Sequence, residues 1–188
     1  MTLKNRVTNG SKERDTDKDF FQTPAYATEL LIEYLIEKDI NYIWEPACGL
    51  GMIADCLRES GLQVFESDIK QRKENITQFD FLSKISYPPM RRFTFDAIIT
   101  NPPYNIKDKF IERCFELKVP FALFLPLYAI GGVKRVEMYM ENGVELLIPN
   151  RRTNFIYPNA GDDNWFHAFW LCHDILPEKL IFAEMERK

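Results

Sequence analysis

The stretch Asn101-Pro102-Pro103-Tyr104 combines residue types that could act on an amino group. It follows an apolar run, residues 93–100, whose composition predicts a buried strand. Two consecutive prolines end a strand, because proline fixes φ and has no N–H to donate to the ladder. The turn therefore lies at the carboxyl end of the strand, which is the edge where open α/β sheets bind ligands. It offers an amide side chain, a backbone carbonyl at Pro102 and the flat ring of Tyr104, and an amino group on a planar base could use all three.

This turn resembles the catalytic Asn-Pro-Pro-Tyr motif of amino-methyltransferases, which move a methyl group from S-adenosylmethionine to an exocyclic or amide nitrogen. The lone pair of such a nitrogen is delocalised, so the nitrogen is a poor nucleophile. The resemblance implies that the Asn101 side-chain oxygen and the Pro102 carbonyl accept hydrogen bonds from the amine and aim its lone pair at the methyl group. Pro103 completes the motif, and Tyr104 would stack on the base. The alternative is an ordinary strand-to-loop turn with an exposed tyrosine.

A second candidate site begins with a short apolar strand, residues 41–44, that runs into a loop with two glycines and then a helix, residues 52–59. Gly49 and Gly51 allow backbone conformations that side chains would block, so the loop can approach a ligand closely. The loop lacks the third glycine of dinucleotide-binding proteins, and it starts with Glu45, which can meet a cationic group. A sulfonium amino acid therefore suits it better than a pyrophosphate, although a tight structural turn remains the alternative. The stretch resembles the S-adenosylmethionine loop of adenine methyltransferases, which assigns cofactor contacts to Glu45, Pro46, Ala47, Cys48, Gly49 and Gly51.

Two acidic residues further along the chain are candidates for contacts with the nucleoside part of a cofactor. Asp68 ends a predicted strand, residues 63–67, and lies 17 residues after Gly51, which suits a ribose-binding acid. Its neighbour Ile69 is expected to contact the cofactor as well. Glu66 is the second candidate for the ribose-binding acid, because side chains alternate along a strand and Glu66 lies on the same face as Asp68. Asp80-Phe81 resembles the pair that reads the cofactor adenine in this family, with Asp80 accepting from the adenine amine. Each acid could also be a solvated carboxylate at a strand end.

The first ordered segment is predicted to begin at residues 20–24, Phe-Phe-Gln-Thr-Pro. Thr23 can cap a helix that has Pro24 at its first position. The Phe-x-Thr-Pro order also resembles the amino-terminal cofactor motif of one group of DNA adenine methyltransferases, which assigns Phe21, Thr23 and Pro24 to the cofactor. The apolar face of the predicted helix contains Leu30, Leu31, Tyr34 and Leu35.

The remaining pattern predicts alternating helices and strands. A loop with two arginines, residues 84–92, precedes the strand at 93–100. The expected elements after the Asn-Pro-Pro-Tyr turn are helices at 106–117 and 130–139, strands at 119–125, 144–149, 152–157 and 166–171, with 144–149 and 152–157 forming a terminal hairpin. Phe155 in that hairpin stands where the resemblance implies an aromatic ring that packs on a flipped base, although a hairpin aromatic is also a usual core residue.

Composition limits the class of protein. A chain of 188 residues with 46% hydrophobic residues fits one globular domain, residues 20–188, behind a polar arm, residues 1–19, that we expect to be flexible. The formal net charge of −4 means that any contact with nucleic acid must come from a local basic patch. The candidates for such a patch are Lys70, Arg72, Lys73, Arg91, Arg92, Lys134, Arg135, Arg151 and Arg152.

Four cysteines occur without a Cys-x-x-Cys pair and without a secretory signal, which predicts reduced thiols and a cytoplasmic protein. The two histidines have no third ligand at metal spacing, so we predict no metal site. The longest apolar run, residues 121–133, is interrupted by Pro126 and is too short to span a bilayer.

Taken in chain order, the four motifs resemble an S-adenosylmethionine-dependent N6-adenine methyltransferase of the minimal phage or prophage type, without a target-recognition domain. The resemblance implies a Rossmann-like α/β class I methyltransferase fold, with a mostly parallel seven-stranded sheet that ends in an antiparallel hairpin. It also implies methyl transfer to adenine N6 in DNA, more than in RNA, with the target base flipped out of its stack. A partner chain could supply target recognition. The alternatives are an RNA adenine-N6 methyltransferase, a protein glutamine-N5 methyltransferase and a non-catalytic binding subunit of the same fold.

Overall fold

The structure is a computed structural model that describes residues 20–83, 94–156 and 166–186. The predicted arm at residues 1–19 and the loop at residues 84–92, with Arg91 and Arg92, lie outside these ranges.

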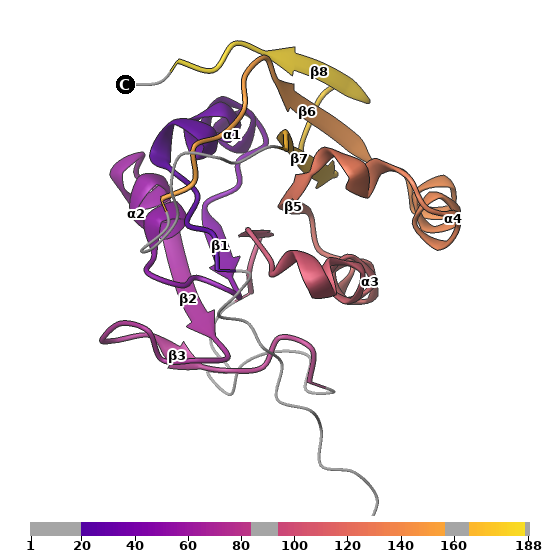
Figure 1. Cartoon of the computed structure of the whole chain (residues 1–188). Coiled ribbons are helices and arrows are strands. Elements are labelled where there is room, and N and C mark those ends of the chain that lie inside the picture. The colour runs from indigo at the N-terminus through magenta and orange to yellow at the C-terminus, as the bar shows by residue number, and fades with distance from the viewer. Residues whose placement is uncertain (1–19, 84–93, 157–165, 187–188) are drawn as a thin grey trace, which may run out of the picture.

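The described residues form an eight-stranded sheet with the order β3-β2-β1-β4-β5-β7-β6-β8 (Figure 1). All neighbouring strands are parallel except β7, which runs antiparallel to both β5 and β6. This arrangement confirms the predicted mostly parallel sheet with an antiparallel strand pair near its end. The strands are β1 (Tyr42–Glu45), β2 (Gln63–Asp68), β3 (Thr77–Gln78), β4 (Ala97–Thr100), β5 (Phe121–Pro126), β6 (Glu145–Pro149), β7 (Ala168–His173) and β8 (Leu180–Ala183).

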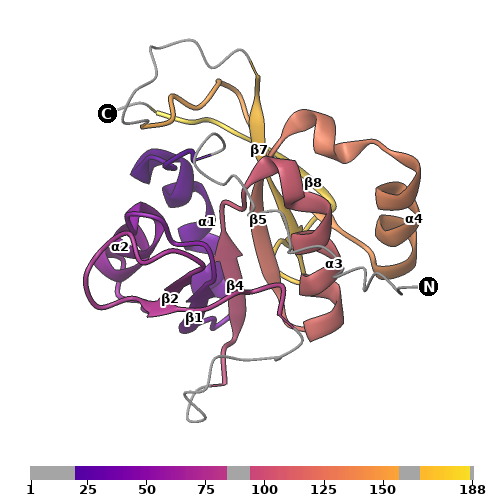
Figure 2. The same cartoon turned by 60° about the horizontal axis from the view of Figure 1, so that its bottom comes forward.

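Helices cover both faces of the sheet. The helices α1 (Ala25–Glu37) and α2 (Met52–Glu59) lie on one side, and α3 (Lys107–Leu117) and α4 (Val133–Asn142) lie on the other (Figure 2). Two short 3-10 helices, η1 (Tyr104–Ile106) and η2 (Leu127–Ile130), follow β4 and β5. α3 confirms the helix predicted at residues 106–117, and its residues Phe110, Ile111 and Cys114 are buried. The helix predicted at residues 130–139 starts three residues later, after η2 and two glycines.

The topology brings the predicted motifs to one edge. β1 pairs in parallel with β2 on one side and with β4 on the other, so the carboxyl ends of the three strands point the same way. The glycine loop follows β1, Asp68 ends β2, and Asn101 follows β4. The edge where these three strands end is therefore the place at which an open α/β sheet binds a ligand.

The strand that pairs with β6 differs from the sequence prediction. Residues 152–156 form no strand of the sheet, and Ile156 makes only an isolated antiparallel bridge with Gln22. β6 pairs instead with β7, which is apolar and buried from Ala168 to Cys172, whereas the 152–156 stretch carries exposed Arg152 and Asn154. Burial of a continuous apolar strand between β5 and β6 decides the pairing. β8 adds an eighth strand parallel to β6 that the sequence analysis did not predict.

The start of α1 also differs from the prediction. The residue that precedes the helix is Pro24, with extended φ −69° and ψ 152°, and no side chain caps the helix. Thr23 stands one residue too early to act as the cap, and its buried hydroxyl has no hydrogen-bond partner. Thr23 is therefore not a capping residue, and its burial needs another explanation. Of the predicted apolar face, Leu31 and Leu35 are fully buried, and Leu30 and Tyr34 pack at its margin.

Candidate active site

A pocket of about 630 Å3, partly open to solvent, lies at the carboxyl edge of β1, β2 and β4. Every predicted motif contributes to its wall. The predicted residues that line it are Phe21, Pro46, Ala47, Asp68, Ile69, Asp80, Phe81, Asn101, Pro102 and Pro103.

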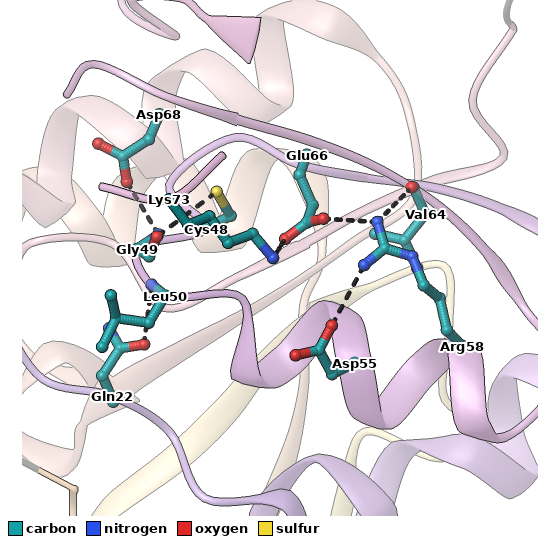
Figure 3. Close-up of polar contacts among 10 residues, drawn as sticks. All are labelled: Gln22, Cys48, Gly49, Leu50, Asp55, Arg58, Val64, Glu66, Asp68 and Lys73. Atoms are coloured by element: carbon teal, nitrogen blue, oxygen red, sulfur yellow. Dashed lines mark hydrogen bonds and ion pairs between the residues drawn. The ribbon is translucent and has the colours of Figure 1, made fainter. Parts of the chain in front are cut away.

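The glycine loop is held against β2 by backbone hydrogen bonds. Asp68 Oδ2 accepts from the Gly49 N–H at 2.9 Å (Figure 3). Asp68 Oδ1 accepts from the Lys70 N–H at 2.9 Å. The Cys48 N–H donates to the Ser67 carbonyl at 3.1 Å. The predicted ribose-binding carboxylate therefore also braces the loop, and it does so at the wall of the pocket.

The backbone conformation and the neighbouring side chains both favour glycine at positions 49 and 51. Both have positive φ, +56° at Gly49 and +89° at Gly51, which suits glycine. A Cβ on Gly49 would lie 2.9 Å from the Phe20 ring and 2.5 Å from Gln22 Nε2, and a Cβ on Gly51 would overlap the Lys73 side chain. Several of these atoms are the ends of flexible side chains, so the expectation that the loop approaches a ligand closely stays a prediction.

Several charged residues that the sequence analysis singled out form ion pairs with other residues of the protein. Glu66 forms ion pairs with Arg58 at 2.6 Å and with Lys73 (Figure 3). Arg135 binds both carboxylate oxygens of Asp108, at 2.8 and 3.0 Å, and its Nε donates to the carbonyls of residues 129 and 131. Lys73 and Arg135 therefore do not belong to a free basic patch, contrary to the sequence prediction.

A smaller cavity adjoins the pocket and shares Phe21, Gln22, Ala47 and Asn101 with it. Within residues 20–83, 94–156 and 166–186, three buried oxygens around it find no hydrogen-bond partner, and these are Thr23 Oγ1, Glu45 Oε2 and Asn101 Oδ1. Asn101 Oδ1 is an acceptor only, the Glu45 carboxyl is one when it is ionised, and buried acceptors are normally satisfied. The cavity therefore suits a ligand that brings N–H donors.

The buried carboxyl group of Glu45 determines how the smaller cavity responds to a charged ligand. Glu45 is 1% exposed, and burial raises the pKa of this carboxyl group well above the ordinary value of 4.5, with the charge of Glu66 raising it further. A hydrogen bond from the Ala54 backbone opposes this shift, as do the charges of Lys73 and Arg58. A cationic group placed in the cavity would favour the ionised carboxylate.

Asn101 has a defined orientation in the turn after β4. Its Nδ2 donates to the Phe21 carbonyl at 3.0 Å, which leaves Oδ1 as the acceptor on the other side of the amide. Pro102 is buried and Pro103 partly so, and both line the larger pocket. The turn thus presents a buried acceptor at the boundary of the two cavities.

Tyr104 and Phe155 belong to one aromatic cluster together with Phe21 and Phe166. The Phe21 ring stacks on Tyr104 with centroids 5.4 Å apart, and it lies 5.3 Å from the Phe155 ring. Tyr104 and Phe155 are 5% and 8% exposed. The two residues predicted to hold a base are therefore close together, but Phe21, which was predicted to contact the cofactor, covers the Tyr104 ring.

Asp80 and Phe81 lie on the far wall of the larger pocket. Asp80 Oδ1 accepts from the Leu82 N–H at 3.0 Å, which folds the turn after it. Phe81 is buried between Trp44 and Phe110, with ring centroids 5.2 and 4.9 Å away. This packing places the Asp80 carboxyl at the pocket wall.

Sequence reasoning missed six residues of the larger pocket, of which Gln22 and Arg72 carry polar or charged groups; the others are Phe20, Phe79, Ile106 and Phe110. Gln22 Oε1 accepts from the Leu50 N–H at 3.1 Å, so this side chain closes over the glycine loop (Figure 3). The Arg72 guanidinium lies 4.1 Å from the centroid of the Phe20 ring at the pocket rim. Gln22 occupies the variable position of the Phe-x-Thr-Pro motif and gave no signal, whereas Arg72 was assigned only to a basic run.

Within residues 20–83, 94–156 and 166–186, no group of three or more His, Cys, Asp or Glu side chains is arranged to hold a metal ion. In the same ranges, no helix is both long and apolar enough to cross a membrane.

Comparison with known proteins supports the fold. No protein-family model matches the sequence. The chain is 31% identical over 143 residues to R405 of Acanthamoeba polyphaga mimivirus, which is named as a candidate RNA methyltransferase; the match covers 72% of this chain but only 33% of that relative.

Two solved structures are similar over most of the chain. One is a modification subunit of a candidate type I restriction enzyme from Vibrio vulnificus, with a TM-score of 0.53 and 14% identity over 92% of this chain and 48% of that one. The other is the candidate RNA methyltransferase PH1948 from Pyrococcus horikoshii, with a TM-score of 0.52 and 14% identity over 88% of this chain and 92% of that one. Together with the strand order, they confirm the predicted class I methyltransferase fold.

Proposed function

We propose that this chain binds S-adenosylmethionine at the carboxyl edge of β1, β2 and β4 and transfers its methyl group to the exocyclic N6 of adenine in a nucleic acid. One observation carries the proposal. Asn101 Oδ1 is a buried acceptor to which none of the described residues donates, and it stands where the larger pocket meets the smaller cavity. An acceptor in this place suits an amine donor next to a bound cofactor.

The residues present fit the cofactor. The larger pocket would hold the adenosine part, with Asp80 near the adenine amine and Asp68 near the ribose. The smaller cavity would hold the amino acid part, with the Glu45 carboxylate facing the ammonium group and Thr23 close by. S-adenosylmethionine supplies an electrophilic methyl group on a sulfonium sulfur and leaves as the thioether.

The chain's own residues would prepare the attacking nitrogen. Asn101 Oδ1 and the Pro102 carbonyl accept from the two N–H groups of the adenine amine, which makes its lone pair available for bond formation. Neither acceptor is basic enough to keep the proton that the nitrogen loses, so this proton passes to water. Tyr104 and Phe155 would hold the base by stacking after Phe21 has moved off the Tyr104 ring.

The type of nucleic acid is the second part of the proposal. The motifs resemble those of DNA adenine methyltransferases, and the sequence analysis favours DNA on this ground. RNA is the second candidate, because R405, which is 31% identical to this chain, is named as a candidate RNA methyltransferase. A glutamine side chain is a weaker candidate, because an aromatic cluster next to the acceptor suits a planar base.

Transfer of tritiated methyl groups from S-adenosylmethionine tests the proposal. Unmethylated DNA, unmodified RNA and unmethylated protein are offered separately, and the labelled product is digested and separated by chromatography. We expect N6-methyladenosine or its deoxy form to carry the label, and Asn101→Ala to abolish it. Label in glutamine, label in another base, or no transfer to any substrate by protein that is folded would overturn the proposal.

A further inference from the structure

We propose that Gln22 is a positioning residue for methyl transfer, because it holds the Phe21 carbonyl in the place that orients the Asn101 amide. This inference rests on the proposed function. It concerns the strap, which we define as residues 20–23, a segment that crosses the carboxyl edge of the sheet before α1 begins.

The strap is fixed at Gln22 from two directions. Its side chain, in a residue that is 6% exposed, accepts from the Leu50 N–H of the glycine loop at 3.1 Å (Figure 3). Its backbone N–H donates to the Ile156 carbonyl at 3.3 Å, and its carbonyl accepts from the Ile156 N–H at 3.0 Å. The peptide unit that carries the Phe21 carbonyl is therefore tied to the glycine loop and to the segment after β6.

The Phe21 carbonyl decides which end of the Asn101 amide faces the site. As observed, Asn101 Nδ2 donates to this carbonyl at 3.0 Å, and Oδ1 is directed away from it. Rotation of the amide by half a turn would place Oδ1 against the carbonyl, so that two acceptors would face each other. It would also offer N–H donors to the incoming amine, which is itself a donor. Only the observed orientation can accept from an amine.

Gln22 thus links the glycine loop to the group that activates the amine. Leu50 and Asn101 have no direct bond in the structure, and the strap connects them through adjacent residues. If Gln22 loses its bond to Leu50, the Phe21 carbonyl is less restrained and both amide orientations become accessible. The consequence is a lower turnover rate with little change in substrate affinity.

Three variants separate this role from general stability. Gln22→Met keeps the length of the side chain and removes the acceptor for Leu50. Gln22→Glu keeps an acceptor and serves as the rescue. Tyr26→Phe is the matched control, because the Tyr26 hydroxyl also ties the start of α1 to the segment after β6, through the N–H and carbonyl of Asn154 at 2.9 and 3.3 Å, without contacting the strap.

Two readouts are measured on the full chain. The first is solvent exchange of the Asn101 side-chain amide protons by nitrogen-15 NMR, with the signal identified by its loss in Asn101→Asp. The second is kcat and KM for methyl transfer to the nucleic acid that the wild type methylates. We expect Gln22→Met to exchange at least about tenfold faster and to lose about tenfold in kcat, with KM for nucleic acid and cofactor within about threefold. Tyr26→Phe should match the wild type in both readouts, and Gln22→Glu should keep the slow exchange of the Asn101 amide that Gln22→Met loses.

Wild-type exchange and wild-type kcat in a folded Gln22→Met would overturn the inference, as would a loss that appears only in the cofactor KM. Thermal melts establish folding, and Gln22→Ala replaces Gln22→Met if the latter unfolds. If the wild type transfers no methyl group, the proposed function is wrong, and the exchange readout still decides whether Gln22 orients Asn101.

Discussion

Glu45 is a buried carboxyl group at the end of β1, and burial raises its pKa well above the ordinary value of 4.5. Because the folded pKa is raised, this group contributes most to stability at pH values below the unfolded pKa, and the contribution is lost as the pH rises through the folded pKa. An amide at this position does not ionise. We therefore expect Glu45→Gln to melt at a higher temperature than the wild type without ligand, with a gap that widens as the pH rises above the ordinary pKa of 4.5.

Thermal denaturation at several pH values measures this gap. Glu33→Gln, at an exposed position on α1, is the control and should follow the wild type at every pH. A gap for Glu45→Gln that stays constant or narrows with rising pH would contradict the prediction.

The same substitution should have the opposite effect on the ligand. If Glu45 faces the ammonium group of the cofactor, Glu45→Gln removes a charged acceptor, and affinity should fall by roughly 1 to 3 kcal/mol. Calorimetry with S-adenosylmethionine or S-adenosylhomocysteine measures the loss. Unchanged affinity in Glu45→Gln would place the ammonium group elsewhere.

Asn101 provides the sharpest test of the chemistry, because its Oδ1 acceptor is needed mainly when the amine attacks. We expect Asn101→Ala to lower kcat by at least about a hundredfold, as is typical when one preorganised polar group is removed, with cofactor affinity close to that of the wild type. Single-turnover kinetics and calorimetry measure the two quantities. A variant that methylates adenine at the wild-type rate would show that this turn is only structural.

The start of α1 allows a test of how a whole helix is stabilised. Removing the side-chain oxygen of a helix-capping residue usually lowers the stability of the protein by about 1 kcal/mol. Thr23 makes no capping bond here, and its hydroxyl is buried without a partner. Thr23→Val, which keeps the shape and removes the hydroxyl, should therefore be as stable as the wild type or more so, as measured by urea unfolding without ligand. A loss of about 1 kcal/mol or more would restore the capping role.

The elements beyond β6 show how burial chooses strand partners. β7 takes the place between β5 and β6 because its side chains are buried on both faces, while residues 153–156 turn back to pair with the strap. This choice matters for the site, since Phe155 then joins Phe21 and Tyr104. The hairpin predicted from the sequence would have placed Phe155 in the sheet.

The charge of the whole molecule limits how it can meet a nucleic acid. The formal net charge is −4, so attraction to phosphates must come from one face. The ion pairs of Lys73 and Arg135 remove both from the predicted patch, while Lys134, Arg151 and Arg152 are exposed.

Replacing both Arg151 and Arg152 by Gln should lower the salt dependence of binding to nucleic acid. On duplex DNA the logarithmic slope should fall by up to about 0.9 for each phosphate that the variant no longer neutralises. Arg135→Gln is the control and should leave the slope unchanged while lowering stability, because it breaks the ion pair that Arg135 Nη1 makes with both carboxylate oxygens of Asp108. Fluorescence anisotropy at several salt concentrations measures the slopes. An unchanged slope in the double variant would exclude this face.

The sequence by itself determined the features that depend on neighbouring residues. The alternation of strand and helix, the buried face of α3 and the apolar strand β5 are periodic patterns that each segment carries on its own. The position of the Asn-Pro-Pro-Tyr turn followed from the prolines that end β4 and from the parallel sheet that the pattern predicted. For the same reason the sequence located Asp68 and the glycine loop at that edge.

Only the tertiary structure decided which atoms meet across the chain. Gln22 reaches Leu50, Lys73 reaches Glu66, and the Phe21 carbonyl receives Asn101 Nδ2 from a residue 80 positions away. None of these interactions has a periodic signal, because each depends on how separate elements pack and on which buried polar groups remain to be satisfied. For this reason the sequence did not predict the pairing of β7, the absence of a side-chain cap at the start of α1 or the role of the strap. Local sequence determines which elements form, and burial determines how those elements pack.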